Sequence, residues 1–337
     1  MIIKATAPTR VDLAGGTLDI HPIFVLEGGA VTVNAAIGLT AEVTIETRGD
    51  ARVEIVAEDI GERAEAGSID SLQPGGPLDL ITRIIAFYKP ETGITVRTKS
   101  NVPSGSGLGA SSSLLIALSH ALNELNGNPY TPDDLIHTGA NLEAQSIGIP
   151  TGKQDYLSAT HGGANALWFQ LNGIQIEPLG SDSEFFETLE SHIVLSFTGA
   201  SHFSATSNWN MIKAYIDDAG GAKAKMKEIK NTALLMRSIL LERRFDEFPR
   251  ALAREWENRK ALAEGVSTPL IEKLMNAAKD AGAAASKICG AGGGGCMITW
   301  APPESRQAVE TALAENGAKI LPFHIARKGV ETTTSEE

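Results

Sequence analysis

Apolar and polar residues alternate with a period of two in several short segments, which is the pattern of β-strands that bury one face. This alternation predicts strands over residues 2–7, 30–36, 40–47, 53–57, 94–99, 163–170, 192–197, 285–289, 296–300 and 319–324. Apolar residues that recur every three or four positions predict amphipathic helices. The helices are expected over residues 78–88, 108–125, 131–147, 208–241, 245–263, 269–281 and 304–316. The polar tail at residues 331–337 is expected to fray.

The chain contains 337 residues, which is long for one hydrophobic core because single cores seldom grow past about 250 residues. We therefore expect two domains. The first part of the pattern mixes strands with helices that follow glycine-rich loops, whereas long amphipathic helices dominate the second part. This change favours a division into residues 1–183 and 184–337.

The formal net charge is −12, which argues against nucleic-acid binding because that depends on clustered Lys and Arg. Apolar stretches stay below the roughly 18 residues that a membrane-spanning helix needs, so we expect no membrane association. Cys289 and Cys296 are the only cysteines, too few for a disulfide framework or a four-cysteine metal site. A reducing, cytoplasmic location is the simplest interpretation.

A glycine-rich segment at residues 103–113, PSGSGLGASSS, lies between a predicted strand and a predicted helix. Glycines at alternate positions allow the main chain to bend so that several N–H groups face one anion, and the helix end adds its positive dipole. This pattern favours a phosphate-binding loop. It is not a Walker A loop, because the Gly-Lys-Ser/Thr step is missing. The alternative is a flexible turn whose serines cap the helix.

Two acidic residues follow this loop. Glu143 lies near the end of the predicted helix 131–147, and Asp155 follows the break at residues 148–152. Phosphoryl transfer needs one carboxylate to hold Mg²⁺ and another to orient or deprotonate the attacking hydroxyl. The pair fits these two tasks when the phosphate loop is considered with it. Taken alone, a surface Glu and a capping Asp would be the ordinary interpretation.

A second glycine cluster, GAGGGG, occupies residues 290–295 between two predicted strands. So dense a run of glycines indicates that another segment or a ligand passes very close to the main chain, with a tight hairpin as the alternative. The run also satisfies the Gly-x-Gly-x-x-Gly pattern of dinucleotide-dependent oxidoreductases, with Glu310 downstream. That interpretation is disfavoured, because a strand and not a helix is predicted to follow the glycines.

Three segments, taken in order, resemble the signatures of the GHMP kinases, named for galactokinase, homoserine kinase, mevalonate kinase and phosphomevalonate kinase. They are APTRVDLAGG at residues 7–16, the loop at residues 103–113 and the glycine run at residues 287–296. The resemblance implies an α+β fold of two domains. The first would be like domain 2 of ribosomal protein S5, with a left-handed crossover, and the second would be ferredoxin-like. It also implies a kinase that transfers the γ-phosphoryl group of Mg-ATP to a hydroxyl.

The resemblance further implies roles for the residues that match the family's motifs. Asp155 would be the catalytic base that faces the acceptor hydroxyl, and Arg10 would be the cation that supports it. Ser111 and Glu143 would bind Mg²⁺. Contacts to ATP would come from Pro103, Gly105, Ser106, Gly107, Leu108, Gly109, Ala110, Ser111 and Ser112.

On the acceptor side, Asp19 matches the Asp that accepts hydrogen bonds from sugar hydroxyls in sugar kinases of the family. The chain most resembles the subgroup of heptose 7-phosphate kinases and related sugar kinases. His202 stands where that subgroup usually has Arg, and Lys153 is an unexpected cation, so an unphosphorylated sugar is a second candidate substrate. The expected acceptor contacts are Asp19, Thr17, Gly16, Gly292, Gly293 and His202.

The expected function is therefore an ATP-dependent kinase that acts on a sugar or sugar phosphate, as a monomer or homodimer. A kinase of a non-sugar alcohol such as mevalonate or homoserine is one alternative. A non-catalytic sensor of nucleotide or sugar on the same fold is another. The sensor is disfavoured because the sequence carries all four residues Arg10, Ser111, Glu143 and Asp155.

Overall fold

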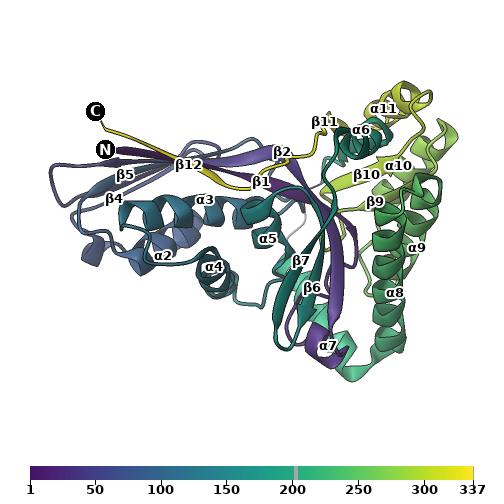
Figure 1. The fold of residues 1–337 in the computed structure, drawn as a ribbon, viewed down its shortest axis with the longest axis horizontal. Helices are drawn as coiled ribbons and strands as arrows, with labels where there is room; N and C mark the ends of the chain where they lie inside the picture. Colours follow the sequence, from purple (N-terminus) through teal and green to yellow (C-terminus); the bar gives the residue numbers. More distant parts are fainter. Residues whose placement is uncertain (201–203, 337) are drawn as a thin grey trace.

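A computed structural model describes residues 1–200 and 204–336. The molecule has two parts that lie side by side, each built from a β-sheet and helices, and both chain ends lie at the far end of the first part (Figure 1). None of the helices in the described part of the chain combines the length and apolar character that a membrane crossing requires.

The first part contains an eight-stranded sheet in which β12, β1, β2, β5, β3 and β4 are neighbours in that order, while β6 pairs with β2 and with β7. All pairs are antiparallel except β3 with β5, which requires a crossover connection between them. This crossover agrees with the predicted fold. The left-handedness expected of the crossover stays a prediction. The strands are β1 (Ile2–Ala14), β2 (Ala30–Thr47), β3 (Val53–Ala57), β4 (Glu62–Ala66), β5 (Ile94–Ser100), β6 (Ala164–Gln170), β7 (Gly173–Gly180) and β12 (Glu331–Ser335).

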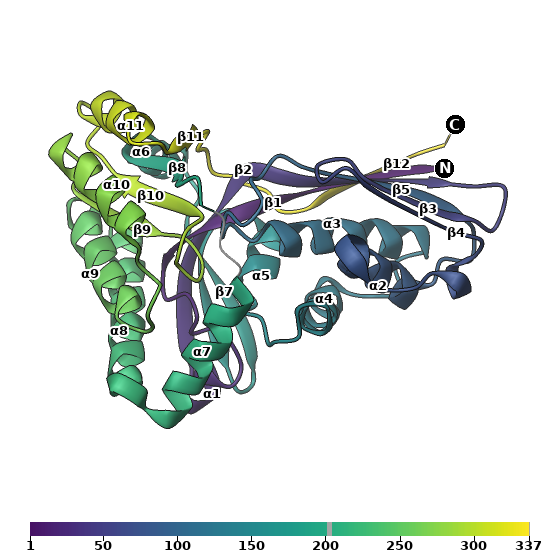
Figure 2. The same cartoon turned by 180° about the vertical axis from the view of Figure 1, so that it is seen from behind.

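Helices cover one face of this sheet (Figure 2). Their apolar sides and the inward residues of β1, β2, β3 and β5 form one continuous core, which includes Ile45, Val96, Leu115 and Leu118. The predicted start of α4 is confirmed, since the Thr131 hydroxyl accepts a hydrogen bond from the N–H of Asp134 at 3.3 Å. The helices are α1 (Ile23–Leu26), α2 (Asp79–Tyr88), α3 (Ala110–Leu125), α4 (Pro132–Ile147) and α5 (Gln154–His161), with 3₁₀ turns at Ile69–Ser71 and Gly76–Leu78.

The second part has a four-stranded antiparallel sheet in the order β11, β8, β10, β9. Helices separate β8 from β9 and β10 from β11, so the connectivity is β-α-β-β-α-β, and the predicted ferredoxin-like domain is confirmed. The strands are β8 (Ile193–Phe197), β9 (Ala285–Ile288), β10 (Cys296–Trp300) and β11 (Lys319–Leu321). The helices are α6 (Ser183–His192), α7 (Ser204–Asp217), α8 (Ala222–Leu241), α9 (Phe248–Lys260), α10 (Pro269–Asp280) and α11 (Arg306–Glu315), with 3₁₀ turns at Ala219–Gly221 and Phe245–Glu247.

The structure corrects the expectation that the polar tail frays. Instead of fraying, β12 pairs with β1, with Ser335 opposite Ile2 and Glu331 opposite Thr6. The last strand of the described chain therefore belongs to the first sheet. The division at residue 183 stays a prediction.

Other elements also differ from the expected pattern. The single helix expected over residues 208–241 is two helices, because Asp218, Gly220 and Gly221 adopt positive φ values of 52°, 60° and 72°. β1 continues seven residues beyond the predicted strand, and residues 7–14 are all buried, so the alternation that reveals a half-exposed strand is lost there. The pattern also missed α1, β4, β7, α5 and α6.

Candidate active site

A cavity of about 700 Å³ opens where the two parts of the molecule meet. One wall comes from the first part: the end of β1 and the turn after it, residues 103–107 and 109–112, and the segment joining α4 to α5. The other wall comes from the second part, through Asn208, Arg259, Gly290 and Ala291. Its size fits a small-molecule site between domains.

The glycine-rich loop lines the middle of this cavity. Gly105, Gly107 and Gly109 have φ values of 68°, 71° and 77°, a left-handed conformation that favours glycine. Alternation of left-handed residues turns successive N–H groups toward one side, which creates a concave site for an anion. α3 then begins at Ala110 without a side-chain cap, so its N-terminal N–H groups remain available to a ligand.

Eight of the nine residues expected to contact ATP line the cavity, and Leu108 does not. Its side chain is fully buried in the hydrophobic core. Leu108 contributes through its carbonyl oxygen, which accepts a hydrogen bond from the N–H of Arg10 at 3.0 Å. The eight are Pro103, Gly105, Ser106, Gly107, Gly109, Ala110, Ser111 and Ser112.

The second glycine cluster packs against the first, which confirms the predicted close approach of another segment. The N–H of Cys296 donates to the carbonyl of Ser106 at 2.6 Å. A Cβ atom on Gly295 would lie 2.6 Å from that same carbonyl oxygen, and one on Gly290 would lie 3.0 Å from the carbonyl of Gly107. Glycine is therefore required for the two loops to meet. Strand β10 directly follows the cluster, which argues against a dinucleotide-binding fold.

The structure does not place Gly292 and Gly293 on the cavity wall. The N–H of Gly293 donates to the carbonyl of Val266 at 2.7 Å, and a Cβ atom on Gly292 would collide with the same residue. These glycines fix the loop to the segment before α10. Gly290 and Ala291 face the cavity in their place.

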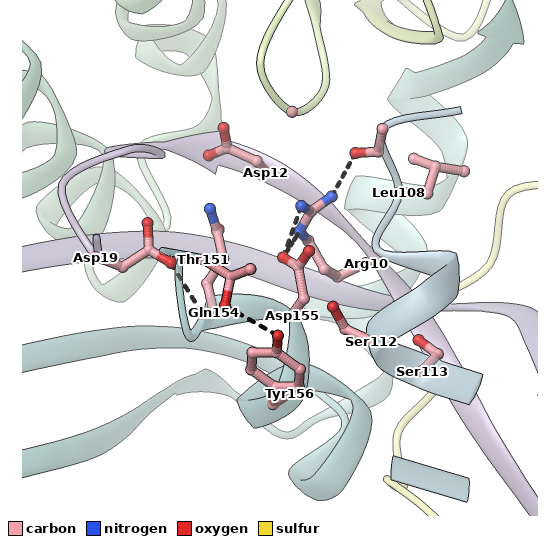
Figure 3. Close-up of polar contacts among 12 residues, drawn as sticks. Arg10, Asp12, Asp19, Leu108, Ser112, Ser113, Thr151, Gln154, Asp155 and Tyr156 are labelled. Carbon is pink, nitrogen blue, oxygen red and sulfur yellow. Dashed lines mark hydrogen bonds and ion pairs between the residues drawn. The ribbon is translucent and has the colours of Figure 1, made fainter. Parts of the chain in front are cut away.

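Arg10 and Asp155 form an ion pair beside the glycine-rich loop (Figure 3). Oδ1 of Asp155 lies 2.7 Å from Nε and 2.6 Å from Nη2 of Arg10, while Nη1 donates to the carbonyl of Gly107 at 2.6 Å. β1 brings Arg10 here between two register irregularities, after Pro8 and after Asp12. Asp155 lies in the first turn of α5. Burial raises the pKa of Asp155, and the charge of Arg10 opposes that rise.

Glu143 is buried and bound by three hydroxyl groups. Ser111 and Tyr156 donate to its two carboxylate oxygens, and Ser112 donates to Oε2 at 2.9 Å. Burial raises the pKa of Glu143 in spite of these bonds. The donor set fits Mg²⁺, which takes oxygen ligands and is usually held by one or two carboxylates together with substrate phosphates. The described residues contain no group of three or more His, Cys, Asp or Glu around one point.

The turn after β1 forms the end of the cavity away from the glycine-rich loop. Asp19 is buried there, and its Oδ2 accepts the N–H of Gln154 at 3.0 Å. A side chain at Gly152 would collide with this carboxylate. Burial raises the pKa of Asp19 to about 6. The expected contact residues Gly16, Thr17 and Asp19 all line the cavity.

Four buried charges that the sequence did not reveal hold this turn against the second part. Lys287 lies 3.0 Å from Oδ2 of Asp12, and Arg259 lies 3.5 Å from the same oxygen and 2.8 Å from Glu255. Arg259 also donates to the carbonyl of Gly16 at 2.8 Å. Burial alone would raise the pKa of Asp12, but the charges of Lys287 and Arg259 outweigh it and lower that pKa. Only the tertiary fold assembles the network, so no local signal identified Glu255 or Arg259.

Two further residues singled out from the sequence do not enter the described site. Nζ of Lys153 lies 2.9 Å from Nδ1 of His137 on α4, and Lys153 is not among the cavity-lining residues. His202 lies outside the described residues. Its contact with the acceptor stays a prediction.

Comparisons with known proteins agree with this geometry. Two family models match, GHMP kinases N terminal domain over residues 79–163 and GHMP kinases C terminal over residues 236–319. The chain is 30% identical to D-glycero-alpha-D-manno-heptose 7-phosphate kinase of Campylobacter jejuni, covering 98% of both chains. It is 26% identical to a mevalonate kinase of Thermococcus sibiricus, again over 98% of both. A crystal structure of a D-glycero-D-manno-heptose 1-phosphate kinase from Bacteroides thetaiotaomicron superposes with a TM-score of 0.81 at 29% identity, over 99% of this chain and 100% of that one.

The fold and the site thus define an ATP-dependent phosphotransferase whose acceptor is a hydroxyl group. Its two domains, the glycine-rich loop between them and the full-length likeness to named kinases all agree on that class. The chain belongs to the GHMP kinase family.

Proposed function

We propose that this kinase phosphorylates a hydroxyl of a sugar, with Asp155 as the base that receives the hydroxyl proton. The observation that carries the proposal is the contact between the carboxylate and the glycine-rich loop. A Cβ atom on Gly109 would lie 2.9 Å from Cγ of Asp155. A triphosphate held by the loop would therefore present its terminal phosphorus next to this carboxylate, where an acceptor hydroxyl can attack it.

The electrostatics of Asp155 suit this role. Burial makes its carboxylate a stronger base than an exposed one, while Arg10 keeps it ionised and holds it in place through two contacts to Oδ1. Arg10 is also positioned to neutralise charge that grows on the transferred phosphoryl group. Because only 21% of the Asp155 side chain is exposed, the acceptor hydroxyl reaches it from the cavity.

Ser111 and Glu143 would hold Mg²⁺. The ion would supply positive charge that offsets the charge of the ATP phosphates. The carboxylate of Glu143 is oriented for this by the hydroxyls of Ser112 and Tyr156. Because Glu143 is buried, bulk water does not compete for its carboxylate.

A sugar is favoured over mevalonate or homoserine by the polar turn opposite the loop. Asp19 supplies a carboxylate that can accept hydrogen bonds from two neighbouring hydroxyls, and Thr17 and Gln154 add polar groups on the same wall. Relatives named as heptose 7-phosphate kinase and as fucokinase support this choice. A sensor without catalysis is disfavoured, because Arg10 and Asp155 are paired directly against the loop. The cytoplasmic location and the monomeric or dimeric state stay predictions.

ADP release measured over a panel of sugars, sugar phosphates, mevalonate and homoserine tests the proposal. We expect ADP release that requires both Mg²⁺ and a sugar-type acceptor. Asp155→Asn should lower kcat by at least about 100-fold while nucleotide affinity is largely kept. Asp280→Asn, an exposed substitution at the end of α10, is the matched control and should behave as wild type. Wild-type turnover in Asp155→Asn would remove Asp155 from its proposed role.

A further inference from the structure

The charges that line the cavity are mostly negative. Among the described lining residues the only cationic side chains are Arg10 and Arg259. Five carboxylates line the same cavity: Asp12, Asp19, Asp59, Glu143 and Asp155. Among the described lining residues, a cationic contact to an anionic acceptor could come only from these two arginines.

Arg10 is bound to Asp155 and to the glycine-rich loop through three of its five N–H donors. Its Nε and Nη2 lie 2.7 and 2.6 Å from Oδ1 of Asp155, and its Nη1 donates to the carbonyl of Gly107 at 2.6 Å. The side chain is 5% exposed. Its position beside the loop assigns it to the phosphate that is transferred.

Arg259 is committed to the protein more completely than Arg10. Nε and Nη2 donate to Oε1 of Glu255 at 3.2 and 2.8 Å, and Nη2 also donates to the carbonyl of Gly16 at 2.8 Å. Nη1 donates to the hydroxyl of Thr17 at 3.2 Å and to the carbonyl of Gly290 at 3.4 Å. The side chain is 1% exposed. An incoming phosphate would have to break several of these bonds, and it would leave Glu255 buried with only Lys287, 3.9 Å away, as a cationic neighbour.

The main chain near the acceptor turn is also occupied. Helix N-termini bind phosphate through free N–H groups, and α5 begins here at Gln154. However, the N–H of Gln154 already donates to Oδ2 of Asp19 at 3.0 Å. A carboxylate of the protein thus already occupies the first N–H group of α5.

We infer that the acceptor is an uncharged sugar and that sugars already carrying a phosphate are rejected. The inference rests on the proposed function and specifies its substrate class. Hydroxyl groups donate hydrogen bonds to Asp19 and Asp155, whereas a phosphate dianion beside the same carboxylates would be repelled in a partly dehydrated cavity. The protein would then differ in substrate from its relative that is named a heptose 7-phosphate kinase.

The test compares matched pairs of acceptors on the purified full-length protein. Free aldoses of five to seven carbons and the terminal phosphate esters of the same aldoses are supplied with Mg-ATP, and kcat/KM is measured from ADP release. We expect the best free sugar to exceed its own phosphate ester on the order of 100-fold or more. Mass measurement of the product should show the addition of a single phosphoryl group.

A variant tests the physical cause. Asp19→Asn removes one repelling charge and keeps an oxygen acceptor for the N–H of Gln154. We expect kcat/KM for the free sugar to fall and the ratio of free to phosphorylated acceptor to narrow by about tenfold or more. An unchanged ratio would contradict the assigned role of Asp19 in excluding phosphate.

The outcomes separate the inference from the proposed function. Preference for a phosphate ester over its free sugar would overturn the inference and leave the sugar kinase standing. Absence of turnover with every sugar and sugar phosphate would overturn the sugar kinase, and the inference would fall with it. Turnover of free sugars alone supports both.

Discussion

Gly109 and Asp155 are in direct contact: Oδ2 of Asp155 would lie 2.9 Å from a Cβ atom built on Gly109. No side chain fits between them. The loop proposed to hold the phosphates and the carboxylate proposed to receive the proton are therefore fixed relative to each other by main-chain geometry.

Gly109→Ala should abolish most of the turnover, because the added methyl group displaces Asp155 and the φ of 77° strains any residue with a Cβ atom. We expect kcat/KM to fall by about 100-fold or more. Gly127→Ala is the matched control, since Gly127 has a φ of 80° but open space around its Cβ position. Both variants should lose about 1–2 kcal/mol of stability, and only Gly109→Ala should lose activity. Equal activity losses would refute the contact argument.

Replacing Arg10 should shift the pH dependence of catalysis. Arg10 opposes the rise in the pKa of Asp155 that burial causes, so Arg10→Gln should raise this pKa further. The acidic limb of the kcat/KM profile should then move to higher pH. Arg10→Lys keeps the charge but loses the two contacts to Oδ1, so its limb should stay nearer that of wild type while kcat falls. If the acidic limb of the kcat/KM profile does not move in Arg10→Gln, a group other than Asp155 controls that limb.

Asp19→Asn should stabilise the fold while it weakens acceptor binding. The pKa of Asp19 is raised by burial to about 6, so the folded state carries a cost for the ionised carboxylate above about pH 6. That cost is relieved as the pH falls through this value. We expect the free energy of unfolding to rise by about 1–3 kcal/mol near pH 8, and this gain to vanish near pH 4. Urea denaturation at both pH values measures it, and a gain independent of pH would exclude Asp19 ionisation as its cause.

Arg259→Met should be strongly destabilising, because it leaves Asp12 and Glu255 buried with reduced compensation. The expected loss in the free energy of unfolding is about 3–5 kcal/mol. Arg254→Met, one turn earlier on α9, is the matched control: Arg254 is 47% exposed and pairs with Glu228 on the surface. Its loss should stay within about 1 kcal/mol. Similar losses in the two variants would show that burial does not strengthen the Arg259 network.

Local chemistry in the sequence predicted much of the site. The glycines at residues 105, 107 and 109 demanded a bent main chain, and that bend exists. Thr131 indicated the start of α4, which carries Glu143. α5 was missed because it has only eight residues and little apolar periodicity, so Asp155 was expected in a turn.

The sequence around Glu255 and Arg259 could not reveal the buried ion-pair network, and the reason is physical. Glu255 and Arg259 are four residues apart on a helix, a spacing typical of a solvent-exposed ion pair. The structure instead buries both, because residues more than 200 positions away in the chain pack over them. Arg259 thus reaches the acceptor turn only through the tertiary fold. The same holds for β12, whose polar sequence gave no indication of its partner β1.

The pairing of β12 with β1 has a consequence for how the protein reaches its folded state. Ile2 and Ser335 stand opposite each other, so one edge of the first sheet is closed by a strand that is synthesised long after β1. Until then β1 presents unpaired N–H and C=O groups to any other chain nearby. The first sheet is therefore complete only after β12 has been synthesised, and until that point the exposed edge of β1 favours self-association of the newly made chain.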